Sequence, residues 1–375
     1  MSEPRPFIDF YTSKGIIPTR QNISDLNAHF RRRETLYRHL GIPKCLLRGI
    51  SIIEFGPGSG HNALFTASCQ PGCYILVDAT PASLESTRAR LAESFGGDHI
   101  RVVESEILAF QTDEKFDLVL CEGVIPTQRD PVAFLKHVAS FARPAGLVVI
   151  TCMDPIAVLP EILRRYVGRL VTADITDFQL QIEALVKFFD QDLRSLTGMS
   201  RRFEDWVVDQ MLHPWSGPLL SVSEAVDGLS ADFEIYASSP HFLVDWRWYK
   251  AVLRDSFGFN QIGKVSYFSQ MHNFLDHRFV CPPREPSLNI RLSEQCDKIY
   301  QRVFAWERGE RQYPVTDVLE DLETLGVDIQ DSHPATREAI ADFARCLKTG
   351  KISDLSSFRN LWGRGQQYIS FIRNE

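Results

Sequence analysis

The sequence has no C-x-x-C pair, no excess of basic residues and no long apolar run. Its eight cysteines are scattered, so neither a zinc site nor a redox motif is expected. Free thiols suit a reducing compartment, which makes the cytoplasm the expected location. No stretch approaches the roughly 20 apolar residues of a membrane span. Residues 1–5 also lack the apolar core of a signal peptide.

The charge balance argues against a general nucleic-acid binder. The formal net charge is −7 over 375 residues, whereas nucleic-acid-binding domains carry a basic excess. The one triple basic run, Arg31–Arg33, is followed at once by Glu34, and we interpret it as the solvated face of a helix. With 44% hydrophobic residues the composition is that of an ordinary globular protein.

The most informative stretch covers residues 51–62 and reads SIIEFGPGSGHN. An apolar strand runs into Glu54, and three glycines then alternate with small residues before a helix-compatible run. Glycine permits a tight turn from strand to helix and lets the backbone approach a ligand without a Cβ in the way. Ligands of open parallel sheets lie outside the carboxyl ends of the strands. The turn is therefore predicted to lie at the mouth of a nucleotide-like site.

Two classes of cofactor use such a turn. The dinucleotide fingerprint G-x-G-x-x-G/A can be fitted to residues 58–63. A pyrophosphate, however, needs free amide donors at the helix start and no fixed anion beside it. Glu54 stands two residues before the first glycine, and Pro57 removes one amide donor. An acidic group in this place favours a cationic ligand, such as the ammonium and sulfonium of S-adenosylmethionine (SAM).

Residues 54–60, with the sequence EFGPGSG, resemble the E/D-x-G-x-G-x-G signature of class I SAM-dependent methyltransferases. Three further blocks follow in the order of that family, at residues 73–78, 102–107 and 116–123. The resemblance implies that Asp78 binds the ribose hydroxyls and that Glu106, where the family often has Asp, lies at the adenine. The implied cofactor is SAM, and its site would be formed by Glu54, Gly56, Gly58, Gly60, Asn62, Asp78, Ala79, Ser105, Glu106, Cys121, Glu122 and Gly123.

Strand-like and helix-like segments alternate over residues 51–152, which predicts a parallel sheet. A sixth strand is predicted over 232–238 and a seventh over 273–280. We predict an α/β fold with a doubly wound, mostly parallel sheet of seven strands, a helical insertion and a helical C-terminal region. The predicted last helix runs through Phe358, Trp362 and Tyr368.

The predicted division of the chain has five parts. They are an N-terminal helical lead or lid (1–50), a SAM-binding core (51–155), a helical insertion that caps the substrate (156–228), the end of the core sheet (229–283) and a helical C-terminal region (284–375). For the last part, a helical cap and a dimer surface are both considered, so a homo-oligomer is left open.

Methyl transfer from a sulfonium is an in-line displacement, so alignment supplies much of the rate. A hydroxyl acceptor gains further from a positioned base. His241 with Asp245 as its orienting carboxylate is one predicted base, and His213 at the end of an inserted helix is another. The pairs Arg164–Arg165 and Arg201–Arg202 are interpreted as solvent-facing. Four tryptophans in the same half are interpreted as core residues: Trp206, Trp215, Trp246 and Trp248.

The sequence thus predicts a SAM-dependent methyltransferase acting on a small molecule or glycan, with a hydroxyl oxygen as the first choice of acceptor. The N-terminal block and the form EFGPGSGHN are also loosely similar to bacterial methyltransferases of surface-polysaccharide pathways. Two alternatives stay open: an NAD(P)-dependent oxidoreductase and a non-catalytic SAM-binding protein. No nucleic acid partner and no metal are expected.

Overall fold

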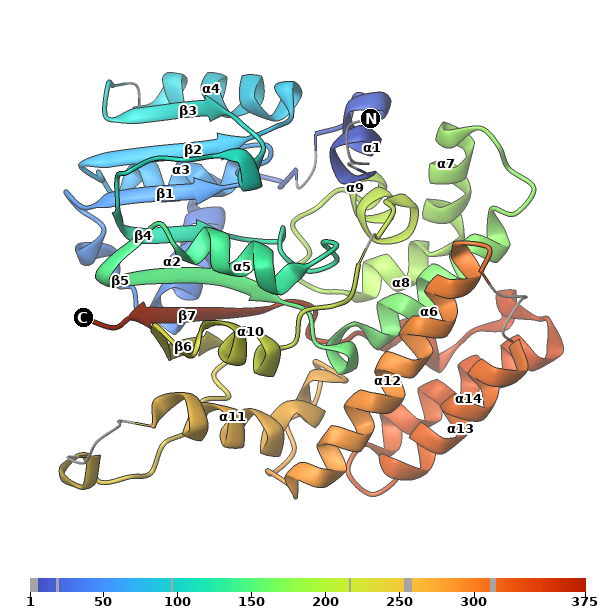
Figure 1. Ribbon diagram of the computed structural model, residues 1–375. Helices are drawn as coiled ribbons and strands as arrows, with labels where there is room; N and C mark the ends of the chain where they lie inside the picture. Colours follow the sequence, from blue (N-terminus) through green and yellow to red (C-terminus); the bar gives the residue numbers. More distant parts are fainter. Residues whose placement is uncertain (1–5, 18–19, 96, 216, 253–257, 311–314) are drawn as a thin grey trace.

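The computed structural model describes residues 6–17, 20–95, 97–215, 217–252, 258–310 and 315–375. Its centre is a seven-stranded sheet in the order β3-β2-β1-β4-β5-β7-β6 (Figure 1). Strands β1 to β5 pair in parallel, and β7 is antiparallel to both of its neighbours. This confirms the predicted α/β fold with a mostly parallel sheet. The strands are β1 (Ser51–Phe55), β2 (Cys73–Asp78), β3 (Ile100–Glu104), β4 (Phe116–Cys121), β5 (Ala142–Cys152), β6 (Phe233–Ser239) and β7 (Gln367–Arg373).

The seventh strand was predicted in the wrong place. Residues 273–280 form the end of a 3-10 helix, η5 (Met271–Phe274), and the loop after it, where the Asp276 carboxylate accepts hydrogen bonds from Arg278 and Thr336. The true seventh strand is the C-terminal β7, so the helix predicted through Tyr368 is also wrong. Instead, β7 enters the sheet between β5 and β6.

Helices cover both faces of the sheet. One face packs against the helices α2 (Leu26–His39), α3 (His61–Ser68) and α4 (Pro81–Phe95). The other packs against α5 (Pro131–Ala139), α6 (Pro155–Val171) and α10 (Val222–Leu229). Successive side chains of a strand point to opposite faces, so Ile52 belongs to the first core and Ile53 to the second. The sheet is therefore buried on both sides, as a parallel sheet requires.

The insertion after β5 is helical, as predicted. Its elements are α6, α7 (Phe178–Phe188), α8 (Asp190–Ser195), α9 (Phe203–Val207) and the π-helix η3 (Val208–Leu212). Asp154 caps α6 by accepting a hydrogen bond from the Ile156 amide at 2.8 Å. α6 leaves the sheet at the carboxyl end of β5 and is buried along almost its whole length. The insertion therefore begins at the edge of the sheet where ligands of this fold class bind.

Arg164 and Arg165 on α6 are buried, which corrects the solvent-facing interpretation. Arg164 pairs with Asp192 at 3.0 Å and lies over the Trp362 ring at 3.7 Å. Arg165 pairs with Glu307 at 2.8 Å. Both arginines tie the insertion to the C-terminal region, because a buried charge persists only when it is paired.

The C-terminal helices share a core with the sheet. α12 (Pro286–Glu307) packs against α6, and α13 (Val315–Asp328) and α14 (Pro334–Thr349) pack against each other (Figure 1). Their buried residues, Leu292 and Phe343 among them, belong to the same apolar cluster as Ile53 of β1. The predicted five-part division stays a prediction. No helix in the described part of the chain is long and apolar enough to cross a membrane. The remaining helices in the described ranges are α1 (Pro6–Lys14), η1 (Lys44–Leu46), η2 (Ile107–Ala109), η4 (Tyr249–Val252), α11 (Phe259–Gln270), η6 (Ile352–Asp354) and η7 (Ser357–Asn360).

Candidate functional site

The glycine turn lies at the carboxyl end of β1, and all three of its glycines have left-handed backbone conformations. The φ angles are +70° at Gly56, +55° at Gly58 and +77° at Gly60, which also begins α3. A Cβ on Gly60 would lie 2.9 Å from the Cα of Thr87, and one on Gly56 would lie 2.6 Å from a methyl carbon of Val124. Neither position accepts a side chain without movement, so the turn depends on glycine for both conformation and space.

Asp78, the last residue of β2, holds this turn from the side. Its carboxylate accepts hydrogen bonds from the Gly58 amide at 3.2 Å and from the Thr80 amide at 2.8 Å. The side chain is buried, and burial raises its pKa despite these amide donors. A carboxylate fixed beside the glycine turn is where the resemblance puts the ribose-binding group, so the position fits that role.

Glu54 belongs to β1, and its side chain is buried. Its carboxylate accepts a hydrogen bond from the hydroxyl of Tyr74, and the residue is only 7% exposed. Burial and the nearby charge of Glu122 raise the pKa of Glu54 to about 7, while Tyr74 and Arg33 act in the opposite direction. Glu54 therefore changes its charge near neutral pH, and a cation placed beside it would favour the ionised form.

Glu122 follows β4 and is fixed by a residue that the sequence interpretation missed. Arg33 of α2 donates to both of its carboxylate oxygens, at 2.8 and 2.6 Å. Arg31 and Arg32 are exposed, as predicted for this run, but Arg33 is buried and stacks over the ring of Tyr37. The helical spacing indicates that Arg33 is buried, because position 33 lies on the same face as the core residue Tyr37 four positions later.

The other predicted cofactor residues lie at neighbouring strand ends. Cys121 is buried at the end of β4, and burial raises the pKa of its thiol. The Gly123 amide donates to the hydroxyl of Thr151 at 2.7 Å. Two more predicted residues lie next to these elements. Asn62 is half-buried in the first turn of α3, and Ala79 is half-buried directly after Asp78.

The predicted adenine residues follow β3. Ser105 donates its amide to the backbone oxygen of Asp78 at 3.0 Å, which links this segment to the ribose position. Glu106 is exposed at the start of η2. The strand ends of β1, β2, β3 and β4 therefore meet at one edge of the sheet, in the order the resemblance implies.

His213 lies in the insertion, in an aromatic setting. Its ring stacks on Tyr11 with centroids 5.4 Å apart and meets the edges of Phe7 and Phe10 from α1. Burial lowers the pKa of His213 to about 4, and its Nε2 has no hydrogen-bond partner among the described residues. Arg165 fixes the backbone by donating to the His213 carbonyl oxygen at 2.8 Å. The imidazole is therefore neutral at pH 7.

The predicted pair of His241 and Asp245 is not formed. His241 is exposed and packs against the ring of His39, with centroids 4.3 Å apart. Asp245 is exposed and pairs with Arg247 at 2.6 Å. Between them, the Val244 amide donates to the hydroxyl of Ser266 on α11. Asp245 therefore does not orient His241, and a catalytic role for either residue stays a prediction.

A half-buried carboxylate that the sequence interpretation missed is Glu161 on α6. Its Oε2 has no hydrogen-bond partner among the described residues, and burial raises its pKa to about 7. It lies one helical turn beyond Ala157, whose carbonyl oxygen accepts from the Gly365 amide. The next residue, Gln366, lies within 3.8 Å of the position that a Cβ on Gly123 would take. The segment before β7 therefore lies against both α6 and the loop after β4.

The N-terminal lead contacts the insertion. The hydroxyl of Tyr11 donates to Asp209 at 2.5 Å, and the Asn22 amide donates to the Ser200 carbonyl oxygen. Arg20 is close enough to His61, at the glycine turn, and to Asp205, in the insertion, to affect the pKa of each. The lead therefore contacts the insertion and comes near the glycine turn, and its role as a lid stays a prediction.

The remaining candidates divide between core and surface. Trp206 and Trp215 are buried, as predicted, whereas Trp246 is 93% and Trp248 64% exposed, so the core interpretation is wrong for the latter two. Arg201 is half-buried and pairs with Asp209, and Arg202 pairs with Glu204 at 3.4 Å.

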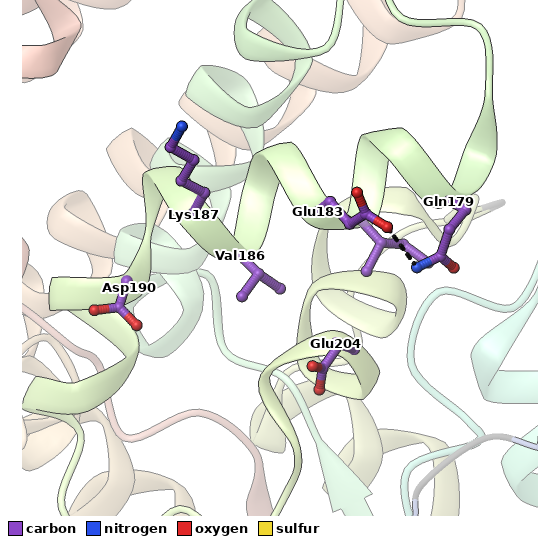
Figure 2. A pocket seen from close by; sticks show the side chains of 7 residues that line it. Gln179, Glu183, Val186, Lys187, Asp190 and Glu204 are labelled. Atoms are coloured by element: carbon purple, nitrogen blue, oxygen red, sulfur yellow. Dashed lines mark hydrogen bonds between the residues drawn. The ribbon is translucent and has the colours of Figure 1, made fainter.

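A surface pocket of about 610 Å³ lies in the insertion and contains none of the predicted site residues. Figure 2 shows its polar lining, in which Gln179 donates to Glu183 at 3.2 Å. The pocket is lined by Gln179, Ile182, Glu183, Val186, Lys187, Asp190 and Glu204. Within the described ranges there is no group of three or more histidine, cysteine or acidic residues that could hold a metal ion.

Comparison with known proteins agrees with this geometry. Residues 46–184 match a family model described as a methyltransferase domain. The chain is 31% identical over 124 residues to the ubiquinone biosynthesis O-methyltransferase of Parvibaculum lavamentivorans, covering 32% of this chain and 49% of that protein. It is 30% identical over 96 residues to a tRNA1(Val) (adenine(37)-N6)-methyltransferase of a Flavobacteriaceae bacterium, covering 24% and 42%. The chain spans about half the length of the curated relatives it matches.

Similar solved structures include a putative sarcosine dimethylglycine methyltransferase from Galdieria sulphuraria, with a TM-score of 0.40, 10% identity and coverage of 93% of this chain and 88% of that one. Another is PKMT2 from Rickettsia typhi in complex with AdoHcy, with a TM-score of 0.42, 16% identity and coverage of 64% and 49%.

Residues 46–184, which include β1 to β5, are therefore similar to a methyltransferase domain. This similarity agrees with the predicted class I SAM-dependent methyltransferase, a class whose cofactor is SAM.

Proposed function

We propose that this protein transfers the methyl group of SAM to a hydroxyl oxygen of a small-molecule or glycan acceptor. The observation that carries the proposal is the glycine turn, flanked by the buried carboxylates of Asp78 and Glu54. Three left-handed glycines beside two acidic groups suit a ligand that has a diol at one end and a cation at the other. The O-methyltransferase relatives support oxygen as the acceptor atom.

The residues divide the work by position. Asp78 would bind the ribose hydroxyls, and Glu54 would supply negative charge at the methionine end. Glu106 would lie at the adenine, and residues 121–123 would border the methyl group. When bound, SAM supplies an electrophilic methyl carbon on a positively charged sulfur. The part of the chain would be to align the acceptor oxygen with this methyl group and to accept the proton that the hydroxyl loses.

Two side chains in the insertion are candidates for the proton acceptor. His213 is neutral at pH 7 and has a free Nε2 among the described residues, but burial holds its pKa far below neutrality. Glu161 has a pKa of about 7, which is better matched to general base catalysis at neutral pH. We expect Glu161→Gln to lower the rate of methyl transfer by about 10²-fold or more, with SAH affinity unchanged. His213→Gln, measured in parallel, would show the larger loss if the histidine is the base.

The activity is tested with SAM carrying a radiolabelled methyl group and three acceptor probes. The probes are 3,4-dihydroxybenzoate as a catechol, a mixture of methyl glycosides, and total tRNA. Label in the catechol or the glycosides supports the proposal. Label in tRNA alone would contradict the choice of acceptor, and S-adenosylhomocysteine (SAH) binding with no transfer to any probe would favour a non-catalytic SAM-binding protein.

Asp78→Ala tests the ribose assignment. We expect SAH affinity to fall at least about tenfold, because the variant removes both the proposed diol contact and the acceptor for the Gly58 and Thr80 amides. The melting temperature should change by only a few degrees, since the side chain lies at the edge of the sheet. Isothermal calorimetry with SAH measures the affinity, and an unchanged dissociation constant would overturn the assignment.

A further inference from the structure

The buried ion pair between α2 and the loop after β4 is not explained by the cofactor contacts alone. Arg33 makes a bidentate pair with Glu122, and its side chain is 8% exposed against 12% for Glu122. The guanidinium also lies 5.1 Å from the centre of the Tyr37 ring and within 3.4 Å of the Tyr37 hydroxyl. Bidentate geometry and a stacked ring fix an arginine in one position.

The pair lies next to Glu54. β1 and β4 are neighbours, and Phe55 is paired with Cys121, so the residues on either side of this rung, Glu54 and Glu122, lie close together. Without Arg33, two carboxylates would share this space, and like charges so close do not both ionise readily. The charge of Glu122 already raises the pKa of Glu54, and that of Arg33 lowers it.

Charged and titratable groups from α2, β2, β4 and the loop after β4 act on Glu54. Tyr74 of β2 donates to it, Glu122 after β4 repels its charge, and Arg33 of α2 attracts it. Tyr37 of α2 and Cys121 of β4 also interact electrostatically with Glu54, and Tyr37 and Tyr368 act on the arginine. Arg33 is thus the positive side chain among them, and it is contributed by the N-terminal lead and not by the sheet.

We propose that Arg33 is a positioning residue for cofactor binding: it holds Glu122 in place and neutralises it, so that Glu54 ionises when a cationic cofactor enters. This inference rests on the proposed function, because it needs SAM or SAH as the ligand. It assigns to helix α2 a direct electrostatic role in the site, beyond covering it.

The consequence is a pH dependence with a definite sign. The ammonium of SAH favours ionised Glu54, so binding releases a proton and affinity rises as the pH passes through about 7. In Arg33→Met, Glu54 would face an uncompensated Glu122, and the midpoint of this rise should move to higher pH. Glu122→Gln removes the repulsion and should move the midpoint to lower pH. Removing both charges together should bring the midpoint back toward the wild-type value.

The test is isothermal calorimetry with SAH between pH 5.5 and 8.5, in two buffers that differ in ionisation enthalpy so that released protons are counted. We expect Arg33→Met to weaken binding about tenfold at pH 7, the factor that one pKa unit represents, and to raise the midpoint. Arg33→Lys should restore the midpoint while losing affinity, since lysine keeps the charge without the bidentate geometry. Arg32→Met is the matched control, because Arg32 is the exposed neighbour on the same helix.

A midpoint that is the same in Arg33→Met and in the wild type would overturn the inference. If Arg33→Met fails to fold, Glu122→Gln serves as the test by itself. An unchanged midpoint in that variant would also overturn the inference. Failure of the wild-type protein to bind SAH at any pH would instead overturn the proposed function, and this inference with it.

Discussion

Gly60→Ala should abolish measurable cofactor binding while leaving a folded protein. The added Cβ would meet the Cα and Oγ1 of Thr87 at 2.9 Å, and Thr87 in turn donates to the Gly58 carbonyl oxygen. The clash is with the backbone of α4 and not with a flexible side chain, so the turn itself must move. We expect SAH affinity to fall by at least about 100-fold, on the scale of losing two or more hydrogen bonds to the ligand.

The control for this variant is Gly49→Ala. Gly49 has the same φ of +77°, but an added Cβ meets nothing within 4 Å. Both variants carry the left-handed conformational cost of about 1–2 kcal/mol, whereas only Gly60→Ala displaces the glycine turn. Calorimetry and thermal unfolding of the two proteins separate stability from binding. Equal SAH affinity in both would show that the turn does not hold the cofactor.

Deletion of residues 367–375 should prevent folding. β7 pairs with β5 over Leu147–Cys152 on one side and with β6 on the other, so its loss separates β6 from the sheet. Ile369 and Phe371 are fully buried, and burying each such side chain contributes roughly 1.5–3 kcal/mol. Their sum approaches the total stability of about 5–15 kcal/mol of a typical protein, before the lost backbone hydrogen bonds are counted.

The measurement is the yield of soluble protein together with thermal unfolding followed by circular dichroism. Deletion of only Asn374 and Glu375, both exposed residues after the strand, is the control and should change the melting temperature by a few degrees at most. A soluble protein with a cooperative transition after the longer deletion would contradict the role of β7 as a central strand.

The parts of the fold that could be predicted are those with local signals. The first five strands and the glycine turn are set by apolar runs, turn residues and the strand-to-helix change of period, all within residues 51–152. β7 could not be placed in this way, because its partners β5 and β6 lie far away in the sequence. A short apolar run shows that a segment is buried, but its strand neighbours depend on tertiary packing.

The buried arginines had a signal that charge alone concealed. Arg33 lies three residues after Phe30 and four before Tyr37, on the core-facing stripe of α2. Arg164 and Arg165 lie inside a helix that is apolar on nearly all sides, which indicates a buried helix. In each case the pattern of the neighbours was a better guide than the residue type. The partners Glu122, Asp192 and Glu307 could not be identified from the sequence, since each comes from a different element.

The candidate site was likewise predictable only where its sequence signals are local. The cofactor residues predicted from the resemblance lie at adjacent strand ends, because that family's motif is itself local to each strand. The pairing of His241 with Asp245 relied on closeness in the sequence, but Asp245 pairs with Arg247 and His241 packs against His39. Glu161 has no motif, and only its unpartnered oxygen and raised pKa on the half-buried α6 position distinguish it from a surface carboxylate.

The most direct test of the central claim is a calorimetric titration of the wild-type protein with SAH and, separately, with NADP⁺ at pH 8. We expect SAH to bind with a stoichiometry of one at the glycine turn, and NADP⁺ to give no binding heat. Binding of NADP⁺ with no binding of SAH would contradict it, because the turn beside Glu54 would then hold a pyrophosphate and not the amino-acid end of a methyl donor.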